Sequence, residues 1–436
     1  MSSVKAPVAG VSLGKSAGEL SSLASNFSWT LAGTVLYAAC NWGLLATIAK
    51  LGGATKLGEY ALGVAIVTPV FMMTNVNLRA VLVTDISRKH RFSEYMDLRL
   101  GGSTVALVSI ICISFFQRWP AELSWAVMLV ALLQSVEAIS DIQWGHLQRD
   151  ERMKEISISM IARGLFSLLM LNVLLVLTGS LIYGLIAMVL SRFSILVLYD
   201  IPRSRTVLAD DLALPDRDRE PTMRSRLNLL CLALPLGLVL MFSSLSQNTP
   251  TYFIKRNLGV AEVGLYAAIV SLLSVGTTVI NALGQTAMPR LAKSYESGDA
   301  DCFRTLTFQL AGLGIGAGIC GVLIARFFGA VVLRVMYRAE FAQHADVLVS
   351  VMISGVAIYL GMLMGYVCTA ARAFVPQVPL FATVAVTSAI ASMLLVPSHG
   401  LTGAAWSIGL SGTVHATGES VILWRTLRRR IKEIAR

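Results

Sequence analysis

The sequence contains few charged residues for its length. Only 14% of its 436 residues are Asp, Glu, Lys or Arg, whereas a soluble protein carries about 25%. The mean hydropathy is +0.70, which leaves too little polar surface to cover a globule in water. These values exclude a soluble enzyme, a nucleic-acid-binding domain and a disordered chain, and they predict a polytopic membrane protein.

Motifs that carry catalysis or hold a cofactor are also lacking. The six cysteines form no Cys-x-x-Cys pair and no Cys/His metal spacing, and no Walker loop or nucleophile elbow occurs. We therefore predict that the protein is not an enzyme and holds no metal or cofactor. The first 23 residues contain no apolar segment of the kind found in a cleaved signal peptide, so we expect the first apolar stretch to insert into the membrane itself.

Long apolar stretches make up most of the remaining sequence. Each is about 20 residues long, the length that a helix needs to cross a bilayer, and none shows the short alternating segments of a β-barrel. Helices are also expected because a backbone in lipid must satisfy its own hydrogen bonds. The sequence thus predicts an all-α polytopic membrane protein with about 12 transmembrane helices. They cover roughly residues 26–49, 60–84, 99–117, 123–146, 156–177, 180–201, 227–250, 263–286, 305–325, 346–370, 377–396 and 401–424.

The basic residues indicate how the chain is oriented. The net charge is +11, but Lys and Arg gather in the gaps between apolar stretches, which argues against nucleic acid as a partner. They are about three times as frequent in the gaps on the N-terminal side of the membrane as in the others, and such an excess marks the cytoplasmic side. We therefore predict that both termini are cytoplasmic.

A charged, proline-rich gap at 202–226 lies at the middle of the chain. Its composition predicts a solvated cytoplasmic linker. The linker separates an N-terminal lobe at 24–201 from a C-terminal lobe at 227–424. Cytoplasmic tails at 1–23 and 425–436 complete the predicted domain organisation.

Several short patterns recur in the two halves. Asn41 lies eleven residues before Gly52. In the second half, Asn248 lies eleven residues before Gly259, and the segments LGEYA and VGLYA then follow in the same order. Six helices per half is an even number, so the halves have the same orientation and form two parallel six-helix lobes. Twin lobes with a cleft between them predict a transporter that works by alternating access.

Three arginines lie inside the predicted helices. Arg79, Arg163 and Arg192 would each cost about 2.5–3.5 kcal/mol at the bilayer centre, so we expect each to face a partner or a wet cavity. Arg192 has no acidic partner apparent in the sequence, and snorkelling to the surface is the alternative for Arg79. We predict that the arginines bind substrate, together with four amides: Asn41, Asn75, Asn248 and Gln247.

Acidic residues inside the membrane are candidates for counter-charges or for ion coupling. Glu137 and Asp141 share one face of their helix, at a depth comparable to that of Arg163. They form a structural network with the arginines or line a ligand site, and the two interpretations are compatible. His415 and Glu419, one helical turn apart, form either a proton-coupling pair or a structural hydrogen bond.

Three prolines stand inside predicted helices. Pro69, Pro235 and Pro250 each remove a helical hydrogen bond, so the helices at 60–84 and 227–250 are expected to be interrupted. Such breaks mark hinges or substrate sites in transporters. Only Pro250 lies beside other polar groups, in SSLSQNTPTY, and we expect that segment to line the outer cleft.

Several segments resemble a known family. NFSWTLAGTVLYAACNW opens the first helix, NLRAVLVTD and FSEYMDLRL span the end of the second helix and the next loop, and GHLQRDERMKEIS closes the fourth. Together they are similar to the Wzx-type polysaccharide flippases of the multidrug/oligosaccharidyl-lipid/polysaccharide exporter superfamily. The likeness in motifs is concentrated in the first 160 residues.

This resemblance implies a V-shaped pair of six-helix bundles in a bacterial inner membrane. It implies flipping of undecaprenyl-pyrophosphate-linked oligosaccharide units, such as those of O-antigen, from the cytoplasmic to the periplasmic face for surface polysaccharide biosynthesis. The pyrophosphate would meet Arg79, with Arg163 and Arg192 as deeper stations and with Glu137 and Asp141 as counter-charges or a protonatable switch. Implied partners are the lipid-linked oligosaccharide, membrane lipid, a glycan polymerase and export machinery. Coupling to H⁺ or Na⁺, the identity of the glycan and the oligomeric state stay open.

Two other functions compete with flipping. A multidrug exporter of the same fold, exchanging cations for Na⁺ or H⁺, needs uncompensated carboxylates, whereas Glu137 and Asp141 each have an arginine at similar depth. A membrane glycan polymerase needs a large periplasmic loop, and every gap on that side is short. Flipping of a lipid-linked oligosaccharide is therefore our leading prediction.

Overall fold

Nearly the whole described chain is helical. The computed structural model describes residues 13–85, 88–212, 222–373 and 376–434. Because lipid offers no hydrogen-bond partners, apolar stretches of this length satisfy their backbone groups as helices. The prediction of an all-α polytopic membrane protein is confirmed.

The helices follow the predicted stretches but extend beyond most of them. The elements are α1 (Leu13–Thr47), the π-helical turn η1 (Ile48–Gly52), α2 (Gly53–Asn75), α3 (Leu78–Thr84), α4 (Phe92–Gln117), α5 (Ala121–Arg149), α6 (Met153–Thr178), α7 (Leu181–Ile195), the π-helical turn η2 (Leu196–Asp200), α8 (Ile201–Leu212), α9 (Met223–Asn257), α10 (Val260–Ser297), α11 (Ala300–Met336), α12 (Ala339–Ala342), α13 (Ala345–Ala370) and α14 (Gln377–Ile434).

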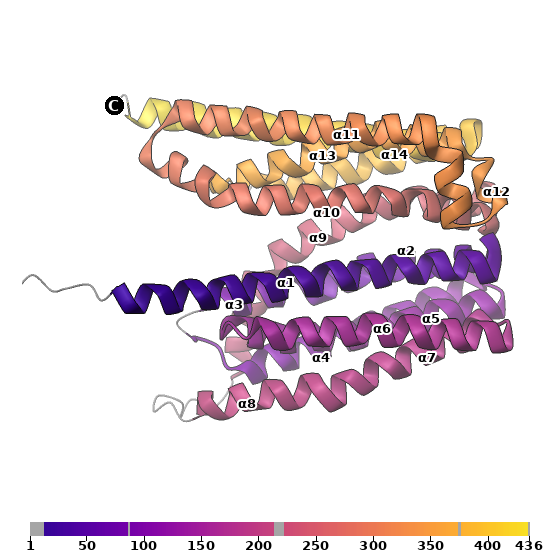
Figure 1. Cartoon of the computed structure of the whole chain (residues 1–436), viewed down its shortest axis with the longest axis horizontal. Helices are drawn as coiled ribbons and strands as arrows, with labels where there is room; N and C mark the ends of the chain where they lie inside the picture. The colour runs from indigo at the N-terminus through magenta and orange to yellow at the C-terminus, as the bar shows by residue number, and fades with distance from the viewer. Residues whose placement is uncertain (1–12, 86–87, 213–221, 374–375, 435–436) are drawn as a thin grey trace, which may run out of the picture.

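Ten helical segments among the described residues are long and apolar enough to cross a membrane. Two of them are unusually long, Ser25–Thr84 with 60 residues and Gln377–Arg428 with 52. Each contains a glycine at a positive φ that ends a helix, Gly53 at 76° and Gly400 at 59°. Figure 1 shows the chain turning back between α1 and α2. The ten segments therefore make twelve crossings, as predicted.

The helices gather in two groups joined by one diagonal helix. In Figure 1, α1 to α8 form the lower group and α10 to α14 the upper group, while α9 runs obliquely from one to the other. We call α1–α8 the first lobe and α10–α14 the second lobe. The start of α9 packs on the first lobe through Leu229 and Ala233. Further along α9, the backbone oxygen of Ser246 accepts a hydrogen bond of 2.6 Å from Ser388 in α14.

The two lobes approach each other closely at one end of the molecule. The first described turns of α1 and the last turns of α14 both lie at the other end, in the lower and the upper group respectively, and we call it the terminal end (Figure 1). At the far end, a Cβ atom on Gly264 of α10 would overlap the carbonyl oxygen of Ala54, and one on Gly58 of α2 would overlap that of Val260. Only glycine permits this approach. Arg338 adds a hydrogen bond of 2.7 Å from its Nε to a carbonyl of η1.

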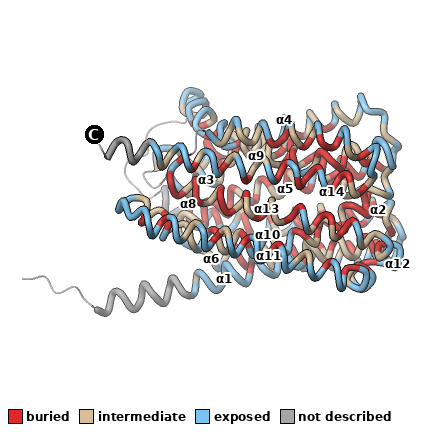
Figure 2. Tube along the Cα trace, turned by 90° about the horizontal axis from the view of Figure 1, so that it is seen from above, coloured by how far each residue is buried: buried red, intermediate tan, exposed pale blue. Residues whose placement is uncertain are grey.

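Large apolar side chains cover the outside of the bundle. Figure 2 shows buried positions on the inward faces of the packed helices and exposed positions along the outer faces of α1, α6 and α11. Strongly exposed apolar residues include Phe115 of α4, Leu177 of α6 and Phe327 of α11, each more than 70% exposed. An apolar exterior of this kind suits lipid as the surrounding solvent.

The prediction that prolines interrupt the helices at 60–84 and 227–250 is wrong. The prolines do not interrupt their helices, because Pro69 lies within α2 and both Pro235 and Pro250 lie within α9. The break near the second predicted helix lies instead between α2 and α3, where Val76 and Asn77 have φ of 40° and 51°. Neighbouring helices can compensate the hydrogen bond that a proline removes in a membrane.

The predicted linker at 202–226 is partly helical. Helix α8 occupies Ile201–Leu212, and α9 begins at Met223. The remainder, residues 213–221, lies outside the described residues, as do residues 1–12 of the predicted N-terminal tail. The latter half of that tail belongs to α1, which begins at Leu13.

Candidate functional site

Glu137 in α5 is the centre of a charge cluster in the first lobe. Its Oε2 accepts hydrogen bonds from Nη1 of Arg163 at 3.0 Å and from Nη1 of Arg192 at 3.1 Å. Its Oε1 accepts from the Tyr37 hydroxyl at 2.8 Å, and Nη2 of Arg192 donates to Oδ1 of Asn41 at 3.3 Å. The sequence shows no acidic partner for Arg192, and the fold brings Glu137 to it from another helix.

Arg163 has a second carboxylate partner, Asp200. The distance from Nη2 to Oδ2 is 2.9 Å, and both side chains are 0% exposed. Ser159 donates to Oδ1 of Asp200 at 2.5 Å, and the ring centroid of Trp144 lies 5.2 Å from the guanidinium carbon of Arg163. Asp200 closes the π-helical turn η2, and such turns interrupt the regular order of faces along a helix. This dry pair joins α6 to η2.

A second cluster lies around Asp141, one turn after Glu137 on α5. Asp141 Oδ1 lies 3.0 Å from Nη1 of Arg79, and Oδ2 lies 3.1 Å from Nη2 of Arg99. Arg79 also donates twice to Oε1 of Gln148, at 3.1 Å from Nε and 2.8 Å from Nη2. Arg99 is 1% exposed, whereas the side chains of Arg79 and Asp141 are 29% and 33% exposed. Solvent therefore reaches the pair of Arg79 with Asp141, whereas the guanidinium of Arg99 is buried.

The two clusters carry a surplus of positive charge. Four arginines meet three carboxylates, so one positive charge has no counterpart within the set. The deep part, Arg163 with Asp200, is closed to solvent, whereas Glu137 is 21% exposed. The accessible part of the network suits an anionic group better than a cation.

The predicted amides are distributed over several places. Only Asn41 belongs to the charge clusters. Asn75 is the last residue of α2, and its Oδ1 is buried without a hydrogen-bond partner among the described residues. In α9, Asn248 and Gln247 donate to carbonyl oxygens one turn earlier in their own helix, so neither contacts the charges of the first lobe.

His415 and Glu419 form the ionisable pair of the second lobe. Both lie on α14, and Nε2 of His415 is 3.6 Å from Oε1 of Glu419. The side chain of Glu419 is 1% exposed and that of His415 15% exposed. The structure thus brings this predicted pair together but keeps it apart from the arginine clusters.

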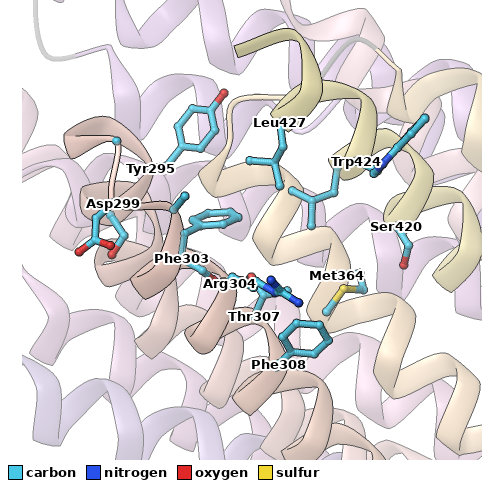
Figure 3. Close-up of a pocket in the computed structure, with 14 residues that line it drawn as sticks. Tyr295, Asp299, Phe303, Arg304, Thr307, Phe308, Met364, Ser420, Trp424 and Leu427 are labelled. Atoms are coloured by element: carbon cyan, nitrogen blue, oxygen red, sulfur yellow. Dashed lines mark hydrogen bonds between the residues drawn. The ribbon is translucent and has the colours of Figure 1, made fainter. Parts of the chain in front are cut away.

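A pocket of about 510 Å³ opens in the second lobe near the terminal end. Figure 3 shows Phe303, Phe308, Trp424 and Met364 around it, with Arg304 among them. Most of its lining is apolar, and it contains none of the predicted site residues. The lining consists of Ser294, Tyr295, Gly298, Asp299, Ala300, Phe303, Arg304, Thr307, Phe308, Met364, Ser420, Leu423, Trp424 and Leu427.

The predicted site residues do not include three members of the clusters: Arg99, Asp200 and Tyr37. Arg99 stood at the first residue of a predicted helix, but α4 begins at Phe92, which places Arg99 two turns inside. Asp200 stood at the last turn of a predicted helix, which in fact continues through η2 into α8. Counting every charged residue within the predicted stretches, their ends included, would have found both. Tyr37 carries no such signal.

Within the described parts of the chain, no group of three or more His, Cys, Asp or Glu side chains is arranged to hold a metal ion. The network instead consists of arginine, carboxylate and amide groups, which exchange hydrogen bonds and ion pairs. The absence of a cofactor stays a prediction.

The chain matches a known protein family over most of its length. The family described as "Polysaccharide biosynthesis protein" matches residues 23–295. Among curated proteins, the capsular polysaccharide biosynthesis protein CapF of Staphylococcus aureus is 23% identical over 389 residues. This match covers 89% of the present chain and 96% of CapF.

Solved membrane transporters have the same fold. A multidrug resistance MATE family transporter of the MOP superfamily in an inward-facing conformation superposes with a TM-score of 0.70 and 13% identity, covering 92% of this chain and 95% of that one. The lipid II flippase MurJ in an inward closed conformation gives 0.70 and 10% identity, covering 92% and 91%. An outward-facing MATE structure gives 0.63 and 13% identity, covering 93% and 94%. The predicted exporter fold is confirmed.

Proposed function

Because the chain belongs to the polysaccharide biosynthesis protein family, we propose that it flips undecaprenyl-pyrophosphate-linked oligosaccharide units across the bacterial inner membrane by alternating access. The proposed direction is from the cytoplasmic to the periplasmic face, with both termini cytoplasmic. A glycan polymerase and export machinery are the proposed partners downstream, because a flipped unit must be joined to others before it becomes a surface polysaccharide.

The observation that carries this proposal is the accessible pair of Arg79 and Asp141. Asp141 also binds the buried Arg99, so it stays neutralised if Arg79 turns away to another anion. Arg79 is 29% exposed and follows the break between α2 and α3, which frees it from the regular helix of α2. It can therefore exchange Asp141 for a phosphate without leaving a bare carboxylate behind.

Electrostatic attraction between Arg79 and a phosphate can offset the loss of the ion pair with Asp141 that the exchange breaks. A charge pair at about 4 Å contributes on the order of 4 kcal/mol at an effective dielectric of about 20. Arginine also matches phosphate oxygens with two parallel hydrogen bonds, which lysine cannot do. The surplus positive charge of the first lobe supports an anionic head group, and the apolar exterior supports a lipid tail that stays in the bilayer.

Alternating access receives support from the contact between the lobes. The glycine contacts of α2 with α10 hold the lobes together at the far end. We propose that this end is the periplasmic side and that the chain is in an inward-facing state. The higher TM-score with the inward-facing MATE structure than with the outward-facing one, 0.70 against 0.63, supports this assignment.

The test is a deletion strain of the native host complemented with variants of the chain. We expect the deletion to abolish surface glycan and to cause lipid-linked oligosaccharide to accumulate on the cytoplasmic leaflet. Arg79→Ala should lower the amount of surface glycan at least about tenfold, which corresponds to about 1.4 kcal/mol. Arg79→Lys should restore part of the activity.

A matched control is Arg203→Ala, which removes an exposed arginine stacked on Tyr199 in the same lobe. It should leave surface glycan at the wild-type level. Immunoblots of membrane fractions establish that each variant is present in equal amount. Wild-type glycan in Arg79→Ala cells would contradict the proposed site, and wild-type glycan in the deletion strain would contradict the function.

Multidrug export is the competing function, because MATE transporters have the same fold. The ion pairs argue against multidrug export. Glu137 and Asp141 each bind two arginines, so neither carboxylate offers an unpaired negative charge to a cationic drug. Under the flippase proposal, the deletion strain keeps its normal drug susceptibility.

A further inference from the structure

We propose that His415 and Glu419 form a proton-binding site inside the second lobe. Three observations on the second lobe support it: a buried carboxylate without hydrogen bonds, two glycines that make room for the pair, and the scarcity of other charges nearby. The proposal concerns proton binding and does not depend on what the protein transports.

The carboxylate of Glu419 is buried and accepts no hydrogen bond from the described residues. The residue is 0% exposed, and neither Oε1 nor Oε2 has a hydrogen-bond partner among the described residues. Its nearest basic group is Nε2 of His415 at 3.6 Å. A buried carboxylate of this kind is costly unless it is paired or protonated, so its charge must be balanced by a proton on itself or on His415.

Two glycines on α13 make room for the two side chains. A Cβ atom at Gly361 would lie 2.7 Å from Nδ1 of His415, and one at Gly365 would lie 3.7 Å from Oε1 of Glu419. Gly361 and Gly365 are one helical turn apart, as are His415 and Glu419 on the facing helix. A side chain at Gly361 would displace the imidazole, so the recess is shaped to hold it.

Other ionisable groups are scarce around the pair. Between residues 347 and 424 the sequence contains no further Asp, Glu, Lys, Arg or His except Arg372, which follows the end of α13, and His399, which lies beside the kink of α14 at Gly400. From α13, the thiol of Cys368 faces the site and donates to the backbone oxygen of Glu419 at 3.2 Å. The first half of α14 contributes the ring of Phe381, 4.9 Å from the imidazole.

Helix α9, which also packs against α14, adds no charge to the site. Its sequence between Leu227 and Ile254 contains no charged residue. Among the described residues, the ion pair that either member forms is the one between them.

The chemistry of the donors favours a proton over a metal ion. Na⁺, Mg²⁺ and Ca²⁺ require several oxygen ligands, whereas this recess offers one carboxylate and one imidazole. With one proton the pair is neutral, and with two it carries one positive charge. The imidazole is the partly exposed member, so it is the group through which a proton enters and leaves. Histidine is suited to this exchange near neutral pH.

The test is infrared difference spectroscopy on the full-length protein in phosphatidylethanolamine–phosphatidylglycerol vesicles. Spectra recorded between about pH 8 and about pH 5 report the carbonyl stretch of a protonated carboxylic acid. Subtracting the spectra of Glu419→Gln from those of the wild type isolates one carboxyl group. We expect this difference to contain a carboxyl band that appears as the pH falls, and a flat difference would overturn the proposal.

The His415→Gln variant tests whether the two groups titrate together. We expect the midpoint of the Glu419 band to shift by about one pH unit or more, because coupled sites titrate as a pair. An unchanged midpoint would show that Glu419 acts alone and would overturn the pair.

Two further variants keep the test independent of folding. Ser420→Ala, next to the site, should leave the band and its midpoint unchanged. Gly361→Ala should change the midpoint by displacing the imidazole, whereas Gly365→Ala, with an ordinary contact distance of 3.7 Å, should not. Circular dichroism and size-exclusion profiles establish that each variant is folded. Equal behaviour of the two glycine variants would contradict the role assigned to the recess.

Discussion

The two charge clusters of the first lobe hold four arginines and three carboxylates, whereas α14 in the second lobe holds one histidine and one buried glutamate. In these clusters, each carboxylate binds at least one arginine, and hydroxyl, amide and indole groups complete the contacts. In the second lobe, the carboxylate of Glu419 has no hydrogen bond at all among the described residues.

This difference separates two uses of buried charge. A network such as that of Arg163 is held in place from several helices, because removing one member leaves another charge buried and unpaired. The isolated pair on α14 has no such support and can change its charge by exchanging one proton. Under the two proposals above, the first lobe presents positive charge to the substrate and the second lobe binds a proton.

The largest expected effect is that of Arg163→Ala. This change leaves Asp200 buried without a counter-charge, so we expect the free energy of unfolding to fall by about 3–5 kcal/mol. Thermal unfolding of the purified protein in detergent measures the loss. The control in the second lobe is Arg304→Ala, an exposed arginine over Phe308, which should change the stability by about 0.5 kcal/mol or less. Equal losses would erase the contrast between the lobes.

A smaller loss is expected for Asp141→Asn. Arg99 then lies buried without a carboxylate, but Asp141 itself is 33% exposed, so we expect a loss of about 2 kcal/mol after allowance for solvent screening. The same unfolding measurement applies. If the Asp141→Asn variant unfolds like the wild type, Arg99 does not depend on this carboxylate.

The contact between the lobes can be tested with Gly264→Ala. The added methyl group overlaps the backbone oxygen of Ala54, so α2 and α10 must separate, at a cost of about 1 kcal/mol or more. Gly316→Ala in α11 is the control, because a Cβ atom there meets nothing within 4 Å. Thermal unfolding compares the two variants, and a stable Gly264→Ala protein would refute a tight contact at the far end.

The smallest effect should come from Arg372→Ala. Arg372 pairs with Glu296 at the surface, where the side chains are 73% and 62% exposed. Exposed pairs contribute about 1 kcal/mol or less, so we expect the unfolding midpoint of the variant to differ little from that of the wild type. This small difference should disappear at high salt, which screens the pair. A loss as large as that of Arg163→Ala would show that surface pairing in the second lobe matters more than the comparison implies.

The candidate site was only partly predictable from the sequence. Counting helical turns predicts that Glu137, Asp141 and Arg163 lie at similar depths. The structure joins Glu137 to Arg163 but pairs Asp141 with other arginines. The partner of Arg192 was not predictable, because Glu137 lies 55 residues earlier in the chain and meets it only when α5 and α7 pack. The roles of these residues in binding stay a prediction.

Hydropathy and charge bias, which are properties of single stretches, determined from the sequence that this is a helical membrane protein with twelve crossings. A run of about twenty apolar residues must form a helix in lipid wherever its neighbours lie. The tertiary structure alone decided which arginine meets which carboxylate, that Arg99 and Asp200 belong inside, and that α2 ends before Arg79 rather than at Pro69. Those outcomes depend on how each helix is rotated about its axis and on what packs against it, and no local pattern contains that information.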